Sequence, residues 1–461
     1  MPTDAHPPGF TPEASGTANA QALQRALDAG GTVQVRVPGT YRIARTVLIG
    51  SHTALRLADG VILQKVVEST PFTHVLLNRG ALTGVPDEHI TIEGLHIQAN
   101  GVDVRHTEVY GLRGQLAMFR ARHVRVERFR CLDLGRWQFA FHACNFEDLH
   151  INDVEIRGLK DGIHLGRGRR FTIRNGLFQT FDDAIALNAH DYATSNPELG
   201  WIEDGLIENC RDLDADTTTG YFCRILAGAW RDWQPGAAVQ HSDTVVHQGR
   251  VYRVHMEPDG RVFASHTAPT HTHGTAVLDG IRWGLVQTDG AHTAGVRRVK
   301  FRNISLEKPR IAFSLHFDDD AYSRSYAPGA ELPVQRDLAF EDVRVEHGTA
   351  CDLIAIDTPV DALSLARAHL RHNAIRFRAQ RHIFNPPPTR ITMRECTFAH
   401  PGPMVLLRNE AANKEIDLHT SSSIELSPSF RASISPGPGR ITWTSDLTGL
   451  NQGQDKGNGH G

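Results

Sequence analysis

Three aspartates fall within one short stretch of the chain, residues 158–188, with the sequence GLKDGIHLGRGRRFTIRNGLFQTFDDAIALN. Asp161 precedes the adjacent pair Asp182 and Asp183 by one interval (182 − 161 = 21). Three carboxylates gathered on one face would repel one another, so the arrangement is costly unless one of them holds a proton. A protonated acid beside an ionised base is what glycosidic cleavage requires, the acid for the leaving oxygen and the base for water.

Short strand-like segments recur along most of the chain. Most consist of an apolar-x-apolar group, two or three polar residues and a second apolar-x-apolar group. The first five begin 22 to 34 residues apart (170 − 148 = 22; 123 − 89 = 34). Such a period indicates a repeat architecture, and β-rich repeats without long helices favour a β-solenoid over helical repeats. The segments begin at His89, His123, Asp148, Arg170, Asp204, Val299, Asp337 and Arg390.

The interval between Asp161 and Asp182 is about the length of one coil of a solenoid. We therefore expect Asp161 to lie beside the Asp182-Asp183 pair on the next rung, ~4.8 Å away. A β-sandwich would also contain short strands, but it would not readily explain why the same pattern of apolar and polar residues recurs.

The two ends of the chain and one interruption of the repeat have patterns of their own. Between Gly16 and Ala29 the apolar residues fall at helical spacing, and a glycine pair follows, which predicts a helix that caps the open end of the solenoid. Where the repeat is interrupted, at residues 230–287, we expect a small β-rich insertion. We expect disorder in the Gly/Gln/Asn-rich C-terminal segment. The expected units are a β-helix domain at 16–445, an insertion at 230–287 and a tail at 446–461.

The composition argues against several classes of protein. The net charge is −3 with both signs spread along the chain, so nucleic acid is not an expected partner. No apolar run approaches the ~20 residues that span a bilayer. The N-terminus, MPTDAHPPGF, lacks a secretory signal, which predicts a cytoplasmic protein or a secreted one whose leader was removed. The six cysteines form no C-x-x-C pair and are expected to be buried and reduced.

The aspartate region resembles the polygalacturonase family, glycoside hydrolase family 28, of the pectin-lyase-like fold. That family has an Asn-Thr-Asp motif and, one coil later, an Asp-Asp pair. Here the first motif is Leu159-Lys160-Asp161, and the pair is followed by AIALN. The resemblance extends from about residue 16 to 226, and more weakly to about 400. It implies an all-β, single-stranded right-handed parallel β-helix and an inverting glycoside hydrolase that cleaves a polysaccharide or oligosaccharide without a cofactor or metal.

The resemblance also implies a role for each site residue. Asp182 would be the general acid, and Asp161 and Asp183 would activate the attacking water. Inversion needs the acid and base roughly 6.5–9.5 Å apart, so that a water fits between them. Arg224 would hold a substrate oxygen. The predicted substrate-binding residues are Arg224, His190, His316 and Trp137, the last matching the family's tryptophan-bearing coil.

Two departures from the family concern the substrate. The Gly-His-Gly motif is missing, and the segment after the aspartate pair is NAHDYATSNPELGW, in which His190 stands in for the histidine. The Arg-Ile-Lys motif is Arg224-Ile225-Leu226. Those two cations hold a substrate carboxylate in polygalacturonases. The loss of one argues against galacturonate and toward a neutral or differently charged sugar.

Two other functions fit the same fold. A polysaccharide lyase needs a base at C5 and usually calcium or an arginine to neutralise the uronate. A non-catalytic, tailspike-like binding protein would use the 230–287 insertion as its binding surface.

Asp318–Asp320 could bind calcium, although a charged turn is the favoured interpretation. His266, His271 and His273 could bind zinc, but no fourth ligand lies at a recognisable spacing, so no metal is expected there. The sequence does not specify the sugar, the linkage or the oligomeric state.

Overall fold

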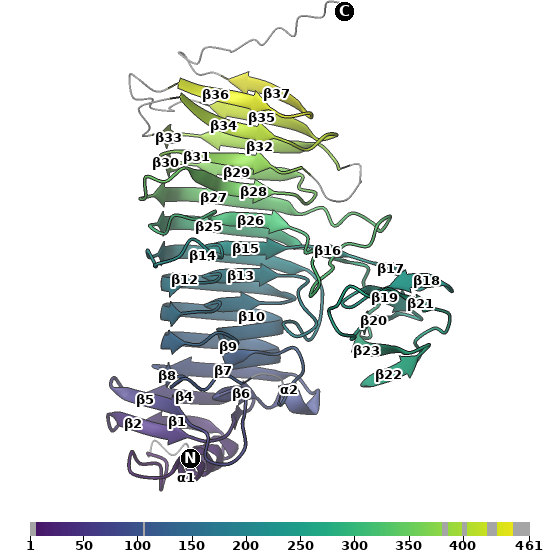
Figure 1. The fold of residues 1–461 in the computed structure, drawn as a ribbon. Helices are drawn as coiled ribbons and strands as arrows, with labels where there is room; N and C mark the ends of the chain where they lie inside the picture. The colour runs from purple at the N-terminus through teal and green to yellow at the C-terminus, as the bar shows by residue number, and fades with distance from the viewer. Residues whose placement is uncertain (1–5, 105–106, 380–385, 399–402, 422–430, 446–461) are drawn as a thin grey trace, which may run out of the picture.

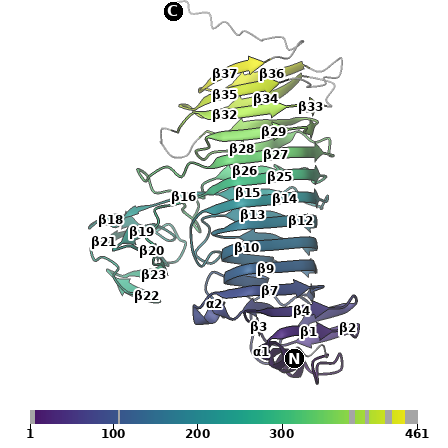
Figure 2. The same cartoon turned by 180° about the vertical axis from the view of Figure 1, so that it is seen from behind.

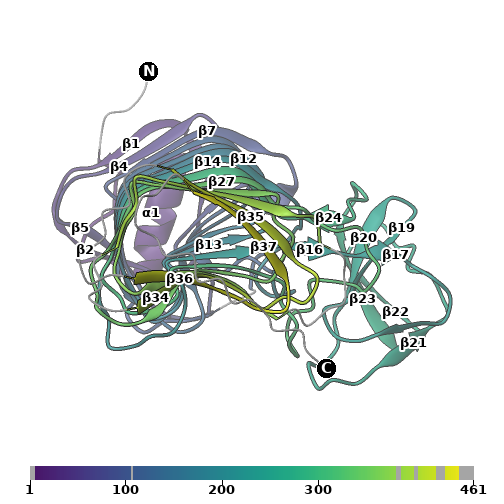
Figure 3. The same ribbon diagram turned by 90° about the horizontal axis from the view of Figure 1, so that it is seen from above.

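The computed structural model of the chain is a right-handed parallel β-helix, as the sequence predicts (Figure 1). It describes residues 6–104, 107–379, 386–398, 403–421 and 431–445; the predicted tail at 446–461 lies outside these ranges. The chain winds from the N-terminal helix α1 (Gly16–Asp28) at one end to strand β37 (Arg440–Ser445) at the other (Figures 1 and 2). Seen along the axis, α1 lies across the end of the coil and a small module projects from one side (Figure 3).

Three faces, each a ladder of parallel strands, make up the coil. The first face contains β1 (Gly31–Val35), β4 (Thr53–Leu57), β7 (Asp87–Glu93), β9 (Gly114–Leu134), β10 (Phe139–Gly158), β12 (Gly168–Thr180), β14 (Ile202–Asp212), β25 (Val296–Leu306), β27 (Arg336–Val345), β29 (Ala362–Ala366), β32 (Thr389–Arg394), β35 (Glu415–Ser421) and β37. The second contains β2 (Gly39–Ile43), β5 (Val61–Lys65), β8 (His96–Gln98), β30 (His369–Leu370), β33 (Thr397–Phe398) and the later parts of the long strands.

The third face is the one that positions the aspartates. After the early parts of β9 and β10, each rung is a short strand that pairs with the corresponding strand of the next coil. Its strands are β3 (Val47–Ile49), β6 (Leu76–Asn78), β11 (Ile163–Leu165), β13 (Ile185–Asn188), β15 (Cys223–Leu226), β26 (Phe313–His316), β28 (Cys351–Ile356), β31 (Asn373–Phe377), β34 (Pro403–Asn409) and β36 (Arg431–Pro436). A short helix, α2 (Gly80–Thr83), follows β6.

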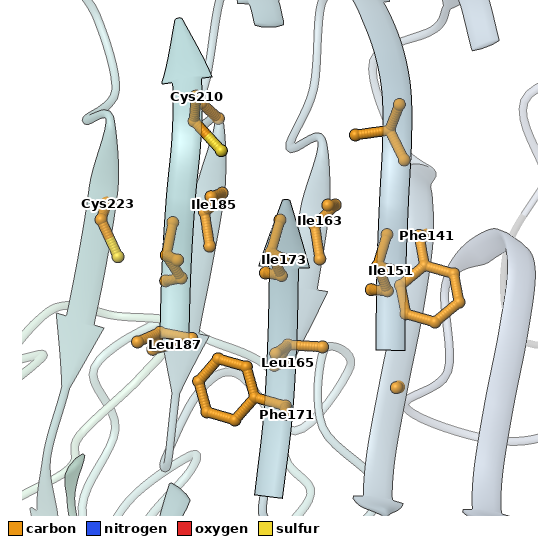
Figure 4. Close-up of a cluster of buried hydrophobic side chains, with 14 of the residues drawn as sticks. Phe141, Ile151, Ile163, Leu165, Phe171, Ile173, Ile185, Leu187, Cys210 and Cys223 are labelled. Carbon is orange, nitrogen blue, oxygen red and sulfur yellow. The ribbon is translucent and has the colours of Figure 1, made fainter. Parts of the chain in front are cut away.

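Alternating side chains of these strands fill the interior of the coil. Ile163 and Ile185 occupy equivalent positions of β11 and β13, and both are fully buried. Figure 4 shows such residues, together with Phe171 and Cys223, pointing inward from successive coils. Stacking identical positions removes a continuous apolar column from water. Five of the six cysteines are buried and none is in a disulfide.

Left-handed backbone positions explain the pattern of apolar and polar residues that recurs in the sequence. A residue with positive φ begins the repeated strand and a second follows five residues later, so two bends bracket each short apolar run. The second bend is often Asn or Asp, which tolerate this conformation better than other side chains. The paired positions are His123 and Arg128, Asp148 and Asp153, Arg170 and Asn175, Asp204 and Asn209, Arg298 and Asn303, and Asp337 and Asp342.

A small β module lies between β15 and β25. Strands β16 (Gly228–Ala229) and β24 (Thr293–Ala294) pair at its base. The module also contains β17 (Arg231–Asp232), β18 (Ala237–Val239), β19 (Thr244–His247), β20 (Arg250–Val254), β21 (Phe263–Ser265), β22 (Thr275–Leu278) and β23 (Ile281–Gln287). The module has its own apolar cluster around Tyr252 and Trp283. The exact unit boundaries, 16–445 and 230–287, stay predictions.

Among the described residues, no helix is both long enough and apolar enough to cross a lipid bilayer.

The bend positions lead to a stability prediction. Asn209 has a φ of 55°, and its side-chain amide donates a hydrogen bond to Oδ1 of Asn175 at 3.2 Å. We expect Asn209→Val to destabilise the protein by about 1–2 kcal/mol relative to Asn209→Gly, because glycine adopts the left-handed conformation freely and a β-branched residue does not. Chemical denaturation of both variants measures the difference. Equal midpoints would show that the bend imposes no such constraint.

Candidate functional site

The pairing of β11 with β13 fixes how the three aspartates stack. Ile163 pairs with Ile185, an offset of 22 (185 − 163 = 22). Asp161 is therefore aligned with Asp183, two residues before each strand. The predicted gathering is present, because one carboxylate oxygen from each of Asp161, Asp182 and Asp183 lies within 4.8 Å of the others. The sequence predicted only that Asp161 lies beside the pair; the register of β11 and β13 aligns Lys160 with Asp182.

Lys160 is the cation of this cluster. Its ammonium group contacts the carboxylate of Asp182 and lies 3.4 Å from Oδ1 of Asp161. Among the described residues, the three aspartates are the one group placed to hold a metal ion. Lys160 already supplies positive charge between two of them. The sequence shows Lys160 only as a departure from the family motif, so its role emerges from the register.

Asp161 is buried, and its neighbours favour its ionised form. Its Oδ2 lies 3.0 Å from Nδ1 of His164, whose ring stacks on Phe139 and whose Nε2 lies 3.4 Å from Asp191. Burial by itself would raise the pKa of Asp161, but the charge of Lys160 and the hydrogen bond with His164 outweigh it and lower the pKa below its usual range. His164 was not predicted as a site residue; its place three residues after Asp161 was the available signal.

Asp182 and Asp183 are shifted in the opposite direction. Asp183 is buried and its Oδ1 accepts the backbone N–H of Tyr221 at 2.9 Å. Burial, followed by the charges of Asp182 and Asp161, raises the pKa of Asp183 well above its usual range. Burial and Asp161 also raise the pKa of Asp182, against the opposing charge of Lys160. The side chain of Asp182 remains 35% exposed, so it is the most accessible carboxyl of the three.

Two buried cations hold the backbone of the turn that carries this pair. Nζ of Lys308 donates to the carbonyls of Thr180 and Thr219 at 2.8 and 2.9 Å. Arg310 donates to the carbonyl of Asp182 at 2.8 Å and forms a buried ion pair with Asp212 at 2.6 Å. These contacts span about 90 to 130 residues of sequence, and no local motif indicates them. They fix where the carboxyl groups of the turn point.

Arg224 lies on β15, in register with His164 through Ala186. Its Nη2 forms an ion pair with Asp318 at 2.7 Å, and Nε2 of His316 lies 3.6 Å from the same carboxylate oxygen. Burial raises the pKa of Asp318 to about 6, against the charge of Arg224, so Asp318 is ionised at neutral pH. The predicted residues Arg224 and His316 thus lie beside one carboxylate, that of Asp318. Asp318 pairs with the arginine, which the sequence did not indicate.

The other two predicted substrate-binding residues have different surroundings. His190 is fully buried, and Nη2 of Arg253 from the inserted module lies 3.1 Å from its Nε2. Burial and Arg253 lower the pKa of His190 well below its usual range. The buried ring connects the inserted module to the coil, and the substrate-binding role of His190 stays a prediction. Trp137 is 50% exposed. Its backbone N–H donates to Asp103 at 2.6 Å.

No protein-family model matches this chain. No curated protein matches it in sequence. Similar solved structures include PfbA, a surface adhesin of Streptococcus pneumoniae, at 15% identity over 90% of this chain and 91% of that chain, with TM-score 0.43. A family 28 exopolygalacturonase of Yersinia enterocolitica is 12% identical over 96% of this chain and 77% of its own, also with TM-score 0.43. A tailspike protein of the E. coli bacteriophage HK620, solved with a pentasaccharide, is 12% identical over 93% and 64%, with TM-score 0.43.

The opposite pKa shifts predict opposite effects of two substitutions on stability. Asp183 has a raised pKa, so its ionisation opposes folding as pH rises from about 4 toward the folded-state value. Asp183→Asn should therefore stabilise the protein above that range, with the gain vanishing near pH 4. Asp161 has a lowered pKa, so Asp161→Asn should destabilise at neutral pH. Denaturation of both variants across pH measures this, and the same sign for both would contradict it.

Proposed function

We propose that this protein is a glycoside hydrolase of the polygalacturonase-like type, acting on a polysaccharide or oligosaccharide. One observation carries the proposal: three carboxyl groups gather within 4.8 Å, and one of them has a lowered pKa while the other two have raised values. Titratable groups whose surroundings separate their pKa values in this way are suited to act as acid and base at one pH. The motifs around Asp161 and Asp182-Asp183 resemble those of the family.

Each aspartate then has a distinct role. Asp182 donates a proton to the leaving oxygen, because it combines a raised pKa with the exposed carboxyl group. Asp161 is the ionised base that accepts a proton from water. Asp183 keeps its own proton through burial, so it adds no third negative charge beside Asp161. Lys160 stabilises the carboxylate that Asp182 becomes after it donates.

Direct attack by water, with inversion at the anomeric carbon, fits this burial pattern. A retaining enzyme needs one carboxylate to attack the sugar while another acts as acid. Asp161 and Asp183 are each about fully buried, at 2% and 1% exposure, so neither reaches an anomeric carbon, whereas water is small enough to lie against them. The nearest oxygens of the three carboxyl groups lie within 4.8 Å of one another, below the roughly 6.5–9.5 Å common in inverting enzymes. The proposal of inversion therefore rests on the burial of Asp161 and Asp183 and not on this spacing.

The charges around the site favour a neutral or amino-bearing sugar. The arginine that would hold a substrate carboxylate is already paired with Asp318 at 2.7 Å, and the family's second cation is replaced by Leu226. Lys160, the other cation beside the aspartates, contacts Asp182. A polyuronate would therefore have to compete with Asp318 and Asp182 for these two cations.

A reducing-sugar assay tests the proposal. We expect wild-type protein to release sugar from at least one member of a panel of neutral, amino-bearing and acidic polysaccharides. Asp182→Asn should lose at least about 100-fold in rate, because general acid catalysis contributes that much or more. Asp59→Asn is the matched control, since Asp59 is 94% exposed and far from Asp182 in the sequence. An undiminished rate in Asp182→Asn contradicts the role of Asp182.

Two other outcomes of the same assay would replace the hydrolase proposal. Products that absorb in the ultraviolet, formed in a reaction that EDTA abolishes, would identify a lyase. Binding to a glycan without release of any sugar would identify a non-catalytic binding protein.

Lys160 provides a test through the pH profile. Removing its positive charge in Lys160→Met raises the pKa of Asp182, which then keeps its proton to higher pH. The alkaline limb of kcat/KM should move up by about one pH unit, and the acidic limb should follow because the pKa of Asp161 also rises. Lys160→Arg keeps the charge and should leave both limbs near their original places. An unmoved profile in Lys160→Met would show that Lys160 does not govern the cluster.

A further inference from the structure

A row of exposed apolar side chains runs beside the aspartates. Trp137 is 50% exposed, and Leu159 and Phe181 are each 37% exposed. Scattered single exposures of this kind are ordinary on protein surfaces. These three differ because they are two residues before Phe139, Asp161 and Asp183 respectively, which are equivalent positions of three successive coils. We call Trp137, Leu159 and Phe181 the apolar strip.

The strand register places the members of the strip on neighbouring rungs. Phe141 pairs with Ile163, which carries the alignment back to Trp137 and Leu159. Gly158 pairs with Thr180, which aligns the next residues, Leu159 and Phe181. Rungs are ~4.8 Å apart, so the strip extends ~10 Å along the axis of the coil and ends one residue before Asp182.

Polar contacts fix the backbone at both ends of the strip while the rings face solvent. At Trp137, Asp103 accepts the N–H at 2.6 Å and Arg113 donates to the carbonyl from Nε at 2.7 Å. At Phe181, the carbonyl accepts from the hydroxyl of Thr219 at 2.5 Å and from Lys308 at 3.3 Å. A surface held in this way loses little conformational entropy when a ligand binds.

The chemistry next to the strip restricts what can cover it. Lys160 and Asp182 lie directly alongside, and an apolar protein or lipid surface laid over them would desolvate both charges at a cost. A sugar ring instead has a C–H face, which packs on aromatic and aliphatic side chains, and hydroxyl groups at its edge, which hydrogen-bond to charged neighbours. Leu159 also occupies the place of the asparagine in the family's Asn-Thr-Asp motif, so an apolar group replaces a polar one.

We propose that the apolar strip binds the C–H faces of consecutive sugar rings, so that the glycan chain lies parallel to the axis of the coil and delivers its scissile bond to Asp182. This inference rests on the proposed hydrolase function for its location, but binding by the strip can be measured without turnover. The strip selects pyranose rings that present an apolar face.

The test separates binding from catalysis. Binding is measured in the Asp182→Asn background on an array of neutral, amino-bearing and acidic oligosaccharides, and kcat and KM are measured with Asp182 intact. We expect Trp137→Ala and Phe181→Ala to weaken binding at least tenfold and to raise KM more than they lower kcat. Trp137→Phe should keep most of the affinity, because it retains a ring. Val85→Ala, at a 69% exposed valine, should change nothing, and thermal melting checks that every variant folds.

Three results overturn one or both proposals. If sugar is released normally and KM is unchanged in Trp137→Ala and Phe181→Ala, the strip is not a sugar site and the hydrolase proposal stands. If oligosaccharides bind through the strip but are never cleaved, the strip stands and the hydrolase proposal fails. If wild-type protein neither binds nor cleaves any oligosaccharide of the array, both fail.

Discussion

The contact of Lys160 with Asp161 and Asp182 is the interaction on which the site depends. Parallel stacking brings the carboxyl groups of adjacent coils together at the spacing of neighbouring strands, where like charges repel. Lys160 places a cation beside Asp161 and Asp182, and burial raises the pKa of Asp183 well above its usual range. The cluster can therefore stay compact and still contain both an ionised and a protonated carboxyl group, which are the two states that acid–base chemistry needs.

The rest of the fold serves to keep that register. Hydrogen bonds of the third face fix β11 against β13 and β13 against β15, so the outward residues of each rung have one possible neighbour. Lys308 and Arg310 hold the turn before β13 from a later coil. Arg253 of the inserted module reaches His190 in the loop after β13. Rigid elements on several sides thus position the side chains before any ligand arrives, a condition for precise catalysis or recognition.

Sequence reasoning could predict the repeat, the fold class and the gathering of the three aspartates, because each depends on local periodicity. The recurring polar positions flanking short apolar runs are the left-handed bends, and the interval from Asp161 to the Asp182-Asp183 pair is close to one coil. The offset of 22 was not readable, since it is set by pairing between coils. The partnership of Arg224 with Asp318 joins residues 94 apart in sequence across an insertion, and the burial of His190 depends on a module whose packing no local pattern specifies.

The protonation states of the three aspartates can be measured directly, without knowledge of the substrate. The protein would be labelled with ¹³C at the aspartate carboxyl groups and titrated by NMR, with each Asp→Asn variant used to assign its signal. We predict that Asp161 stays ionised below the pH at which ordinary aspartates, with pKa ~3.9, take up a proton, and that Asp183 still carries its proton well above that pH. Three aspartates that all titrate near the ordinary value would contradict the opposite shifts of Asp161 and Asp183.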